Sequence, residues 1–259
     1  MSVSQCEVAC PLLVVENISH RFGDFVALDD ISFTVPRRGV HSFIGPNGAG
    51  KTTLFNCVAG LLRPSRGKVS LDGVDITRVP AHRRVHLGLG RSFQVTSLFQ
   101  NLTVFENARL AAQAHCGRRA FGMLGERGSL VDASDKAGDA LALLGLMAMR
   151  GALAGELSHG QQRRLEIALA VCGDAKALLL DEPTSGMGVD DLAGMTALIA
   201  ELARDRAVIL VEHNIDLVLA ISETLTVLHH GRVLCAGAPR AVAARPEVRE
   251  AYLGSAVPC

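Results

Sequence analysis

Apolar residues in this chain form short continuous runs in some segments and repeat at helical spacing in others. Continuous apolar runs at residues 177–180 and 207–211 predict strands that are buried on both faces, as in a parallel sheet. Further strands are predicted at 12–18, 25–35, 40–44, 67–71, 74–76, 91–93, 225–228 and 233–236. Asp72 and Gly73 separate two of these strands and predict a hairpin with a primed turn.

The helical spacing marks the remaining ordered segments. Helices are predicted at 51–62, 102–111 and 137–146, with another that begins near 157, a short basic helix at 81–86, and two short helical pieces at the C-terminal end. Glycines, serines and arginines interrupt the pattern between residues 115 and 134, which predicts an irregular, mobile segment.

Composition narrows the class of protein. The chain has 259 residues, 49% of them hydrophobic, which is enough for a sizeable core in one large domain or two lobes. Its formal net charge is zero, so no overall positive field favours nucleic acid. The longest uncharged apolar stretch, 140–149, is too short to span a bilayer. Because no signal-peptide pattern opens the chain and its seven cysteines are scattered, we expect a reducing cytoplasm.

The clearest chemical motif is a phosphate loop. Residues 45–53 match G-x-x-x-x-G-K-[ST] at every fixed position, between a predicted strand and a predicted helix. Loop amides and a helix N-terminus can surround a phosphate there. Lys51 can reach the β- and γ-phosphates, and the Thr52 hydroxyl can bind Mg²⁺. The predicted nucleotide-binding residues of the loop are Gly45, Pro46, Asn47, Gly48, Ala49, Gly50, Lys51, Thr52 and Thr53.

Two of the predicted buried strands end in polar residues. Asp181 and Glu182 follow the run at 177–180, and His213 follows the run at 207–211. Ligands of open α/β sheets bind at the carboxyl ends of strands. Asp181 there could hold Mg²⁺ through water, and Glu182 could orient or deprotonate the attacking water. His213 could hydrogen-bond the γ-phosphate and link it to that water.

Two other residues keep two interpretations each. The Phe22 ring lies in a polar turn, where it could stack on a purine base or fold back onto the core. Gln94 lies at the end of a predicted strand. In one interpretation its neutral side chain binds either hydrated Mg²⁺ or the attacking water. In the other it is an ordinary loop amide.

A second anion site is predicted near residue 158. Ser158 and Gln161 have the spacing of a capping box, which by itself only starts a helix. With Gly160, the same residues present free N–H groups at a helix N-terminus, where an anion can bind.

Taken in order, these motifs resemble an ABC-transporter ATP-binding subunit over nearly the whole chain. The matching elements are GPNGAGKTT at 45–53, Gln94, LSHGQQ at 157–162, LLLDEP at 178–183 and His213. LSHGQQ, upstream of the acidic strand, distinguishes this family from other phosphate-loop proteins. More narrowly, GLGRSFQVTSLFQNLTVFENARLA, LSHGQQRRLEIALA and VREAYLG resemble importers of branched-chain amino acids, a subfamily whose relatives carry urea or other amino-acid-like solutes.

The resemblance implies a fold and a division of the chain. The implied fold is α/β: a phosphate-loop NTPase core with a parallel sheet, an N-terminal antiparallel β subdomain and a helical subdomain. Residues 1–259 form a single ATP-binding domain. Residues 12–95 and 176–259 supply the core and the antiparallel β lobe, and 96–175 form the helical lobe that contains the signature motif.

The resemblance also implies a mechanism and partners. Two ATP-binding subunits, identical or sister chains, pair head to tail and enclose Mg-ATP between the phosphate loop of one and the signature helix of the other. Ser158, Gly160 and Gln161 then face the partner's γ-phosphate. Phe22 becomes the adenine-stacking ring and Gln94 the γ-phosphate sensor. The complex includes permease subunits and, indirectly, a solute-binding protein, and the ATPase lies on the cytoplasmic face of the membrane.

Two residues depart from the family pattern. His159 stands in the signature where many members have glycine, and Gly188 stands where many have an acidic or amide residue.

Two other functions compete with import. One is an ATPase for lipopolysaccharide export, and the other is a switch module in translation or DNA repair. The single ATP-binding unit and the lack of basic surplus argue against the switch module.

Overall fold

The computed structural model describes residues 10–92, 98–116 and 126–253. Its strands are β1 (Leu13–Phe22), β2 (Phe25–Val35), β3 (Gly39–Ile44), β4 (Arg66–Leu71), β5 (Val74–Asp75), β6 (Leu89–Arg91), β7 (Ala177–Asp181), β8 (Ala207–Val211), β9 (Thr224–His229) and β10 (Arg232–Gly237). Its α-helices are α1 (Lys51–Ala59), α2 (Ala81–Arg84), α3 (Val104–Cys116), α4 (Glu126–Leu143), α5 (His159–Val171), α6 (Val189–Leu202), α7 (Ile215–Ile221), α8 (Pro239–Ala243) and α9 (Pro246–Leu253).

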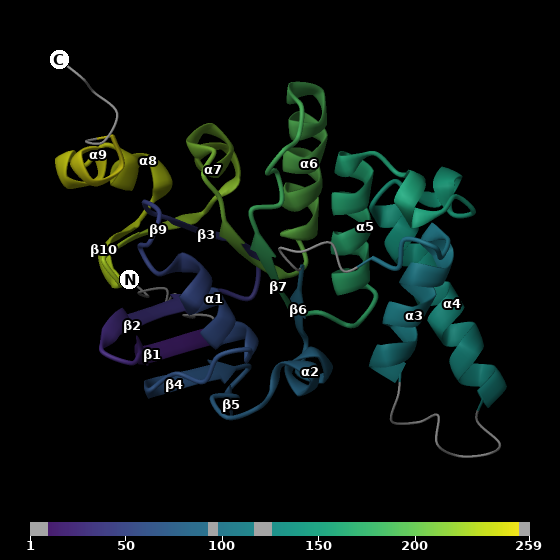
Figure 1. Ribbon diagram of the computed structural model, residues 1–259, viewed down its shortest axis with the longest axis horizontal. Coiled ribbons are helices and arrows are strands. Elements are labelled where there is room, and N and C mark those ends of the chain that lie inside the picture. Colours follow the sequence, from purple (N-terminus) through teal and green to yellow (C-terminus); the bar gives the residue numbers. More distant parts are fainter. Residues whose placement is uncertain (1–9, 93–97, 117–125, 254–259) are drawn as a thin grey trace, which may run out of the picture.

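The strands form two sheets. A four-stranded antiparallel sheet has the order β2-β1-β4-β5, and a six-stranded sheet has the order β10-β9-β3-β8-β7-β6. In the larger sheet β9, β3, β8, β7 and β6 run parallel, and β10 closes one edge as an antiparallel hairpin with β9. Helices α3, α4 and α5 gather at the far end of the molecule from the antiparallel sheet (Figure 1). The α/β fold with an antiparallel β subdomain is therefore confirmed.

The six-stranded sheet separates two hydrophobic cores. In β7 and β8, alternate residues point to opposite faces because side chains alternate along a strand. Leu178, Leu180 and Leu210 join a core with α3 to α7, whereas Leu179 and Ile209 join a core with α1 and the antiparallel sheet. The continuous apolar runs in the sequence are thus strands buried on both faces, as predicted.

Several predicted boundaries differ from the structure. β1 extends to Phe22, so the hairpin turn is shorter than expected and Phe22 ends a strand. Helix α1 stops at Ala59 because Gly60 takes a left-handed conformation (φ 81°), and Leu61 is exposed instead of buried on a helix. The two long connections to β8 and β9 contain α6 and α7, which the sequence analysis did not predict.

The prediction of an irregular segment at 115–134 is wrong for its second half. Helix α4 begins at Glu126 and continues through that segment. Ala133, Ala137 and Leu141 recur at helical spacing, and all three are fully buried in the core that also includes α3 and α5. Packing of this narrow seam outweighs the weak local helix preference of the glycines and serines. Residues 117–125 lie outside the described residues.

No helix among the described residues combines the length and the hydropathy needed to cross a bilayer.

Burial controls the ionisation of one histidine in β3, the strand that leads into the phosphate loop. The His41 ring is 3% exposed, stacks on Phe43 with centroids 4.8 Å apart, and lies 2.9 Å from Thr226 Oγ1 through Nε2. Burial lowers the pKa of His41 to about 4. The unfolded chain therefore binds a proton at a higher pH than the folded chain does.

Stability is expected to fall as the pH drops from about 6.5 toward 4, because protonation then favours the unfolded state. In urea unfolding, His41→Gln removes about 2 kcal/mol of the pH-dependent loss between pH 7 and pH 5. The exposed His82→Gln serves as the control and keeps the wild-type dependence. Parallel pH curves for the wild type and His41→Gln would contradict this account.

Candidate nucleotide-binding and hydrolytic site

The phosphate loop occupies the turn between β3 and α1. Gly50 is the N-terminal cap of α1 and has φ 99°, a left-handed conformation that favours glycine. The Lys51 side chain is 7% exposed and folds back into the loop, where Nζ donates to the carbonyl oxygens of Gly45 at 2.6 Å and Pro46 at 3.1 Å. Burial lowers the pKa of Lys51, and the carboxylates of Glu182 and Asp181 act in the opposite direction. The ammonium therefore lies inside the loop, against its carbonyl oxygens.

A cleft of about 240 Å³ opens along this loop. It is lined by Phe22, Phe25, Ala27, residues 47–53, Glu182 and His213. The structure therefore brings together the predicted aromatic ring, most of the phosphate loop and two of the predicted catalytic residues. Gly45 and Pro46 form the start of the same loop and contact Lys51 through their carbonyl groups.

Phe22 and Phe25 both line the cleft and are paired across the β1–β2 hairpin. The Phe22 ring is 50% exposed and meets His20 edge to face, with centroids 4.7 Å apart. A ring folded onto the core would be buried, so this exposure favours the base-stacking interpretation, which stays a prediction. Phe25 was predicted only as a strand residue. Its position opposite Phe22 across a tight turn is the signal that could have identified it.

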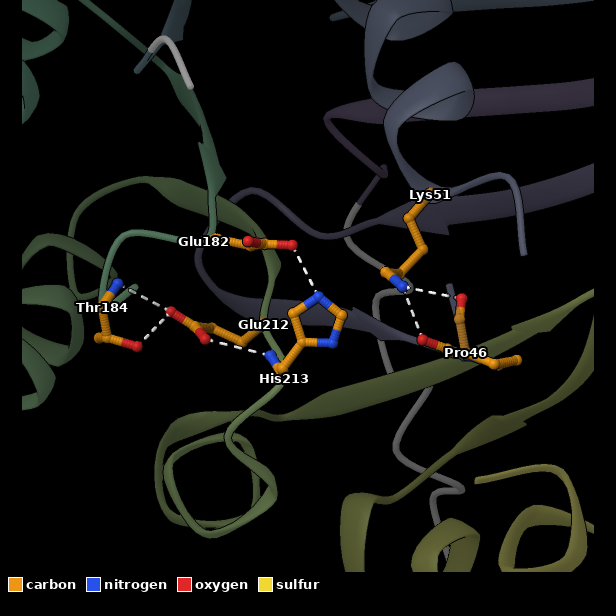
Figure 2. Close-up of polar contacts among 7 residues, drawn as sticks. Pro46, Lys51, Glu182, Thr184, Glu212 and His213 are labelled. Carbon is orange, nitrogen blue, oxygen red and sulfur yellow. Dashed lines mark hydrogen bonds and ion pairs between the residues drawn. The ribbon is translucent and has the colours of Figure 1, made fainter. Parts of the chain in front are cut away.

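Glu182 and His213 meet at the carboxyl ends of β7 and β8. His213 Nε2 lies 2.6 Å from Glu182 Oε1, and Figure 2 shows this pair between Lys51 on one side and Glu212 on the other. Glu182 has φ 50°, a left-handed conformation that is uncommon for glutamate. A carboxylate and an imidazole that face a phosphate loop can bind and deprotonate a water molecule.

Asp181 lies deeper at the same edge. It is 2% exposed, and neither carboxylate oxygen has a hydrogen-bond partner among the described residues. Burial raises the pKa of Asp181 to about 6, against the opposing influence of Arg91. A buried carboxylate with two unused oxygens suits a hydrated Mg²⁺, which prefers oxygen ligands. The exposed Thr52 hydroxyl lines the cleft and offers another oxygen.

The signature residues form the predicted capping box at the start of α5. Ser158 N donates to Gln161 Oε1 at 2.9 Å, and Gln161 N donates to Ser158 Oγ at 3.3 Å. Ser158, Gly160 and Gln161 do not line the cleft, so the two predicted anion sites are separate within this chain. Gln94 lies outside the described residues.

The two departures from the family pattern have clear local settings. His159 Nε2 lies 3.1 Å from the Ser185 carbonyl oxygen, and because that oxygen can only accept, Nε2 donates. The ring therefore connects the signature turn to the loop after β7. Gly188 is the N-terminal cap of α6 and supplies no side-chain cap. An acidic or amide residue there could cap the helix.

Comparison with known proteins identifies the family. The sequence model of the family described as ABC transporter matches residues 28–185. The chain belongs to the ABC transporter family.

Relatives of this ABC transporter protein span almost its whole length. It is 37% identical to the high-affinity branched-chain amino acid transport ATP-binding protein BraF of Pseudomonas aeruginosa, over 95% of this chain and 99% of the relative. It is 34% identical to the lipopolysaccharide export system ATP-binding protein LptB of Acidithiobacillus ferridurans, over 94% of this chain and 97% of the relative. A crystal structure of an ABC-transporter ATP-binding cassette in its ADP conformation has a TM-score of 0.82 and 31% identity, and covers 94% of this chain and 99% of its own.

Two loop glycines with positive φ provide a matched test of the phosphate loop. A Cβ at Gly50 would lie 2.8 Å from the Ala27 carbonyl oxygen and 2.9 Å from Leu28 Cδ2, whereas a Cβ at Gly48 (φ 79°) would meet nothing within 4 Å. Both alanine variants carry backbone strain, but only Gly50→Ala adds overpacking, so it should be less stable than Gly48→Ala by about 1–3 kcal/mol. Urea unfolding without nucleotide measures the difference. Equal unfolding midpoints would show that the contact at Gly50 relaxes freely.

Proposed function

We propose that this chain is the ATP-hydrolysing subunit of an importer of branched-chain amino acids or related polar solutes. The observation that carries the proposal is the Glu182–His213 pair, held at 2.6 Å within the cleft that the phosphate loop lines. The similarity to BraF, which is named for branched-chain amino acid transport, supports the solute class.

In this proposal, the chain's own residues position ATP and water. Phe22 stacks on adenine, with Phe25 beside it. The loop amides of residues 47–50 and the N-terminus of α1 surround the phosphates, and Lys51 leaves its carbonyl partners to bind them. Thr52, Asp181 and, with them, Gln94 would hold Mg²⁺, which would supply positive charge next to the transferred phosphoryl group. Glu182 accepts the proton of the attacking water, while His213 orients Glu182 and contacts the γ-phosphate.

The signature residues complete the site of a second subunit. Ser158, Gly160 and Gln161 lie at the start of α5, away from this chain's own cleft, where a helix N-terminus attracts an anion. A head-to-tail pair of ATP-binding subunits, identical or sister chains, brings each signature to the other's phosphate loop. Permease subunits and, indirectly, a solute-binding protein complete the transporter. The ATPase then lies peripherally on the cytoplasmic face of the membrane, with residues 96–175 as the helical lobe.

Glu182→Gln tests the assignment of the base. The variant should bind Mg-ATP and form a stable dimer while ATP turnover falls on the order of a hundred- to ten-thousand-fold, because the amide cannot accept the proton. Turnover, nucleotide binding and dimer mass are measured together, with the exposed Glu201→Gln as a control that keeps wild-type turnover. Turnover of Glu182→Gln at the wild-type rate would show that Glu182 is not the base, and His213 would be tested next.

Reconstitution distinguishes import from lipopolysaccharide export, which the similarity to the export ATP-binding protein keeps as the second candidate. With its permease in vesicles, the proposed importer should hydrolyse ATP faster when a solute-binding protein loaded with a branched-chain amino acid is added. Stimulation by a lipid-extracting permease, with no response to the binding protein, would instead support export.

A further inference from the structure

A buried carboxylate lies next to the proposed hydrolytic pair but outside the cleft. Glu212 directly follows β8, is 3% exposed, and accepts three hydrogen bonds (Figure 2). Thr184 donates to Oε1 through its backbone N–H at 2.9 Å and its hydroxyl at 2.6 Å, and the His213 backbone N–H donates to Oε2 at 3.1 Å. Both oxygens of the carboxylate are therefore engaged.

Burial of the Glu212 carboxylate costs free energy unless these hydrogen-bond donors replace its lost hydration. A buried carboxylate loses its hydration, and none of the ion pairs within the described part of the chain involves Glu212. Hydrogen bonds from N–H and O–H groups to a charged acceptor are strong enough to offset much of this loss. The three donors thus hold Glu212 in one position, and Glu212 in turn holds the donors.

The donors come from two different loops. Thr184 lies two residues after Glu182 in the loop that follows β7, whereas His213 lies in the loop that follows β8. One carboxylate therefore connects the backbones that carry the two members of the Glu182–His213 pair. The side chains of that pair meet at 2.6 Å on the cleft side of this connection.

Glu182 needs such support because its backbone is strained. Its φ of 50° places a side chain with a Cβ in the left-handed region. Such conformations persist only where the surrounding structure holds them. Two backbone hydrogen bonds hold Glu182 itself. Its N–H donates to Val211 O at 2.9 Å, and its carbonyl oxygen accepts from Ser185 N at 3.1 Å.

We propose that Glu212 is a positioning residue for ATP hydrolysis, and that it holds the loops after β7 and β8 so that Glu182 and His213 meet. This inference rests on the proposed function. Glu212 does not line the cleft, so it acts on the reaction only through Thr184 and the backbone of His213.

Glu212→Gln tests the role with almost no change in size. One carboxylate oxygen becomes an NH₂ group, which must point either at the His213 N–H or at the Thr184 N–H, so one pair of donors always faces each other. We expect kcat to fall on the order of tenfold, because small displacements of catalytic groups lower the rate steeply. KM for ATP and the affinity for Mg-ATP should change less than about twofold, because the phosphate loop is untouched.

Thr184 supplies the partner variants. Thr184→Val removes the hydroxyl donor and should lower kcat in the same way, and Thr184→Ser should regain most of the lost rate because it restores the donor. The double variant Glu212→Gln/Thr184→Val should lose less than the product of the two single losses, since both break one connection.

Glu166→Gln is the matched control, because Glu166 is also a buried carboxylate (5% exposed) but pairs with Arg163 at 2.8 Å along α5. It should retain wild-type kcat. If the wild type is active and Glu212→Gln has the same kcat, the positioning role is wrong while the proposed function stands. Equal losses in both glutamine variants, or a loss of ATP affinity in step with the rate, would also overturn it. A wild-type transporter that hydrolyses no ATP would instead overturn the proposed function, and this inference with it.

Discussion

Parallel pairing of β3, β8 and β7 is the constraint on which the site depends. Phe43 is paired with Val211 in one ladder, and Asp181 is paired with Val211 in the next. Three loops therefore leave the sheet on one side, at the carboxyl ends of these strands. They are the phosphate loop, the acidic loop after Asp181, and the loop that contains His213. Residues more than a hundred positions apart in sequence meet there because parallel strands present their carboxyl ends on the same side.

Several charged side chains are buried at the carboxyl ends of these strands, and their surroundings differ. Lys51 is held by loop carbonyl oxygens, and Glu212 is held by three N–H and O–H donors. Asp181 has no hydrogen-bond donor among the described residues, and its pKa is raised to about 6. Glu212 and Asp181 are thus buried carboxylates in opposite settings: the oxygens of Glu212 all accept hydrogen bonds, whereas those of Asp181 have no partner among the described residues.

The hydrophobic pattern predicted strands more accurately than helices. The run at 207–211 coincides with β8, because burial on both faces leaves a short and dense apolar signal. The strand at 25–35 coincides with β2, where Ile31, Phe33 and Val35 alternate with polar residues. The first half of helix α4 was missed, and Ala133, a buried residue in that half, is small and contributes little to a hydropathy pattern. The stability of α4 comes from packing rather than from its own sequence.

The sequence by itself determined the parts of the protein whose chemistry is local. The phosphate loop, the capping box at Ser158 and the hairpin turn at Asp72 each depend on a few adjacent residues, and each formed as predicted. Tertiary structure alone decided which distant groups meet: that Glu182 reaches His213, and that Glu212 binds Thr184. These contacts follow from strand order and register. Register is a relation between two strands, and a slip by one residue moves every side chain of a strand to the other face of the sheet. It therefore cannot be read from any one segment.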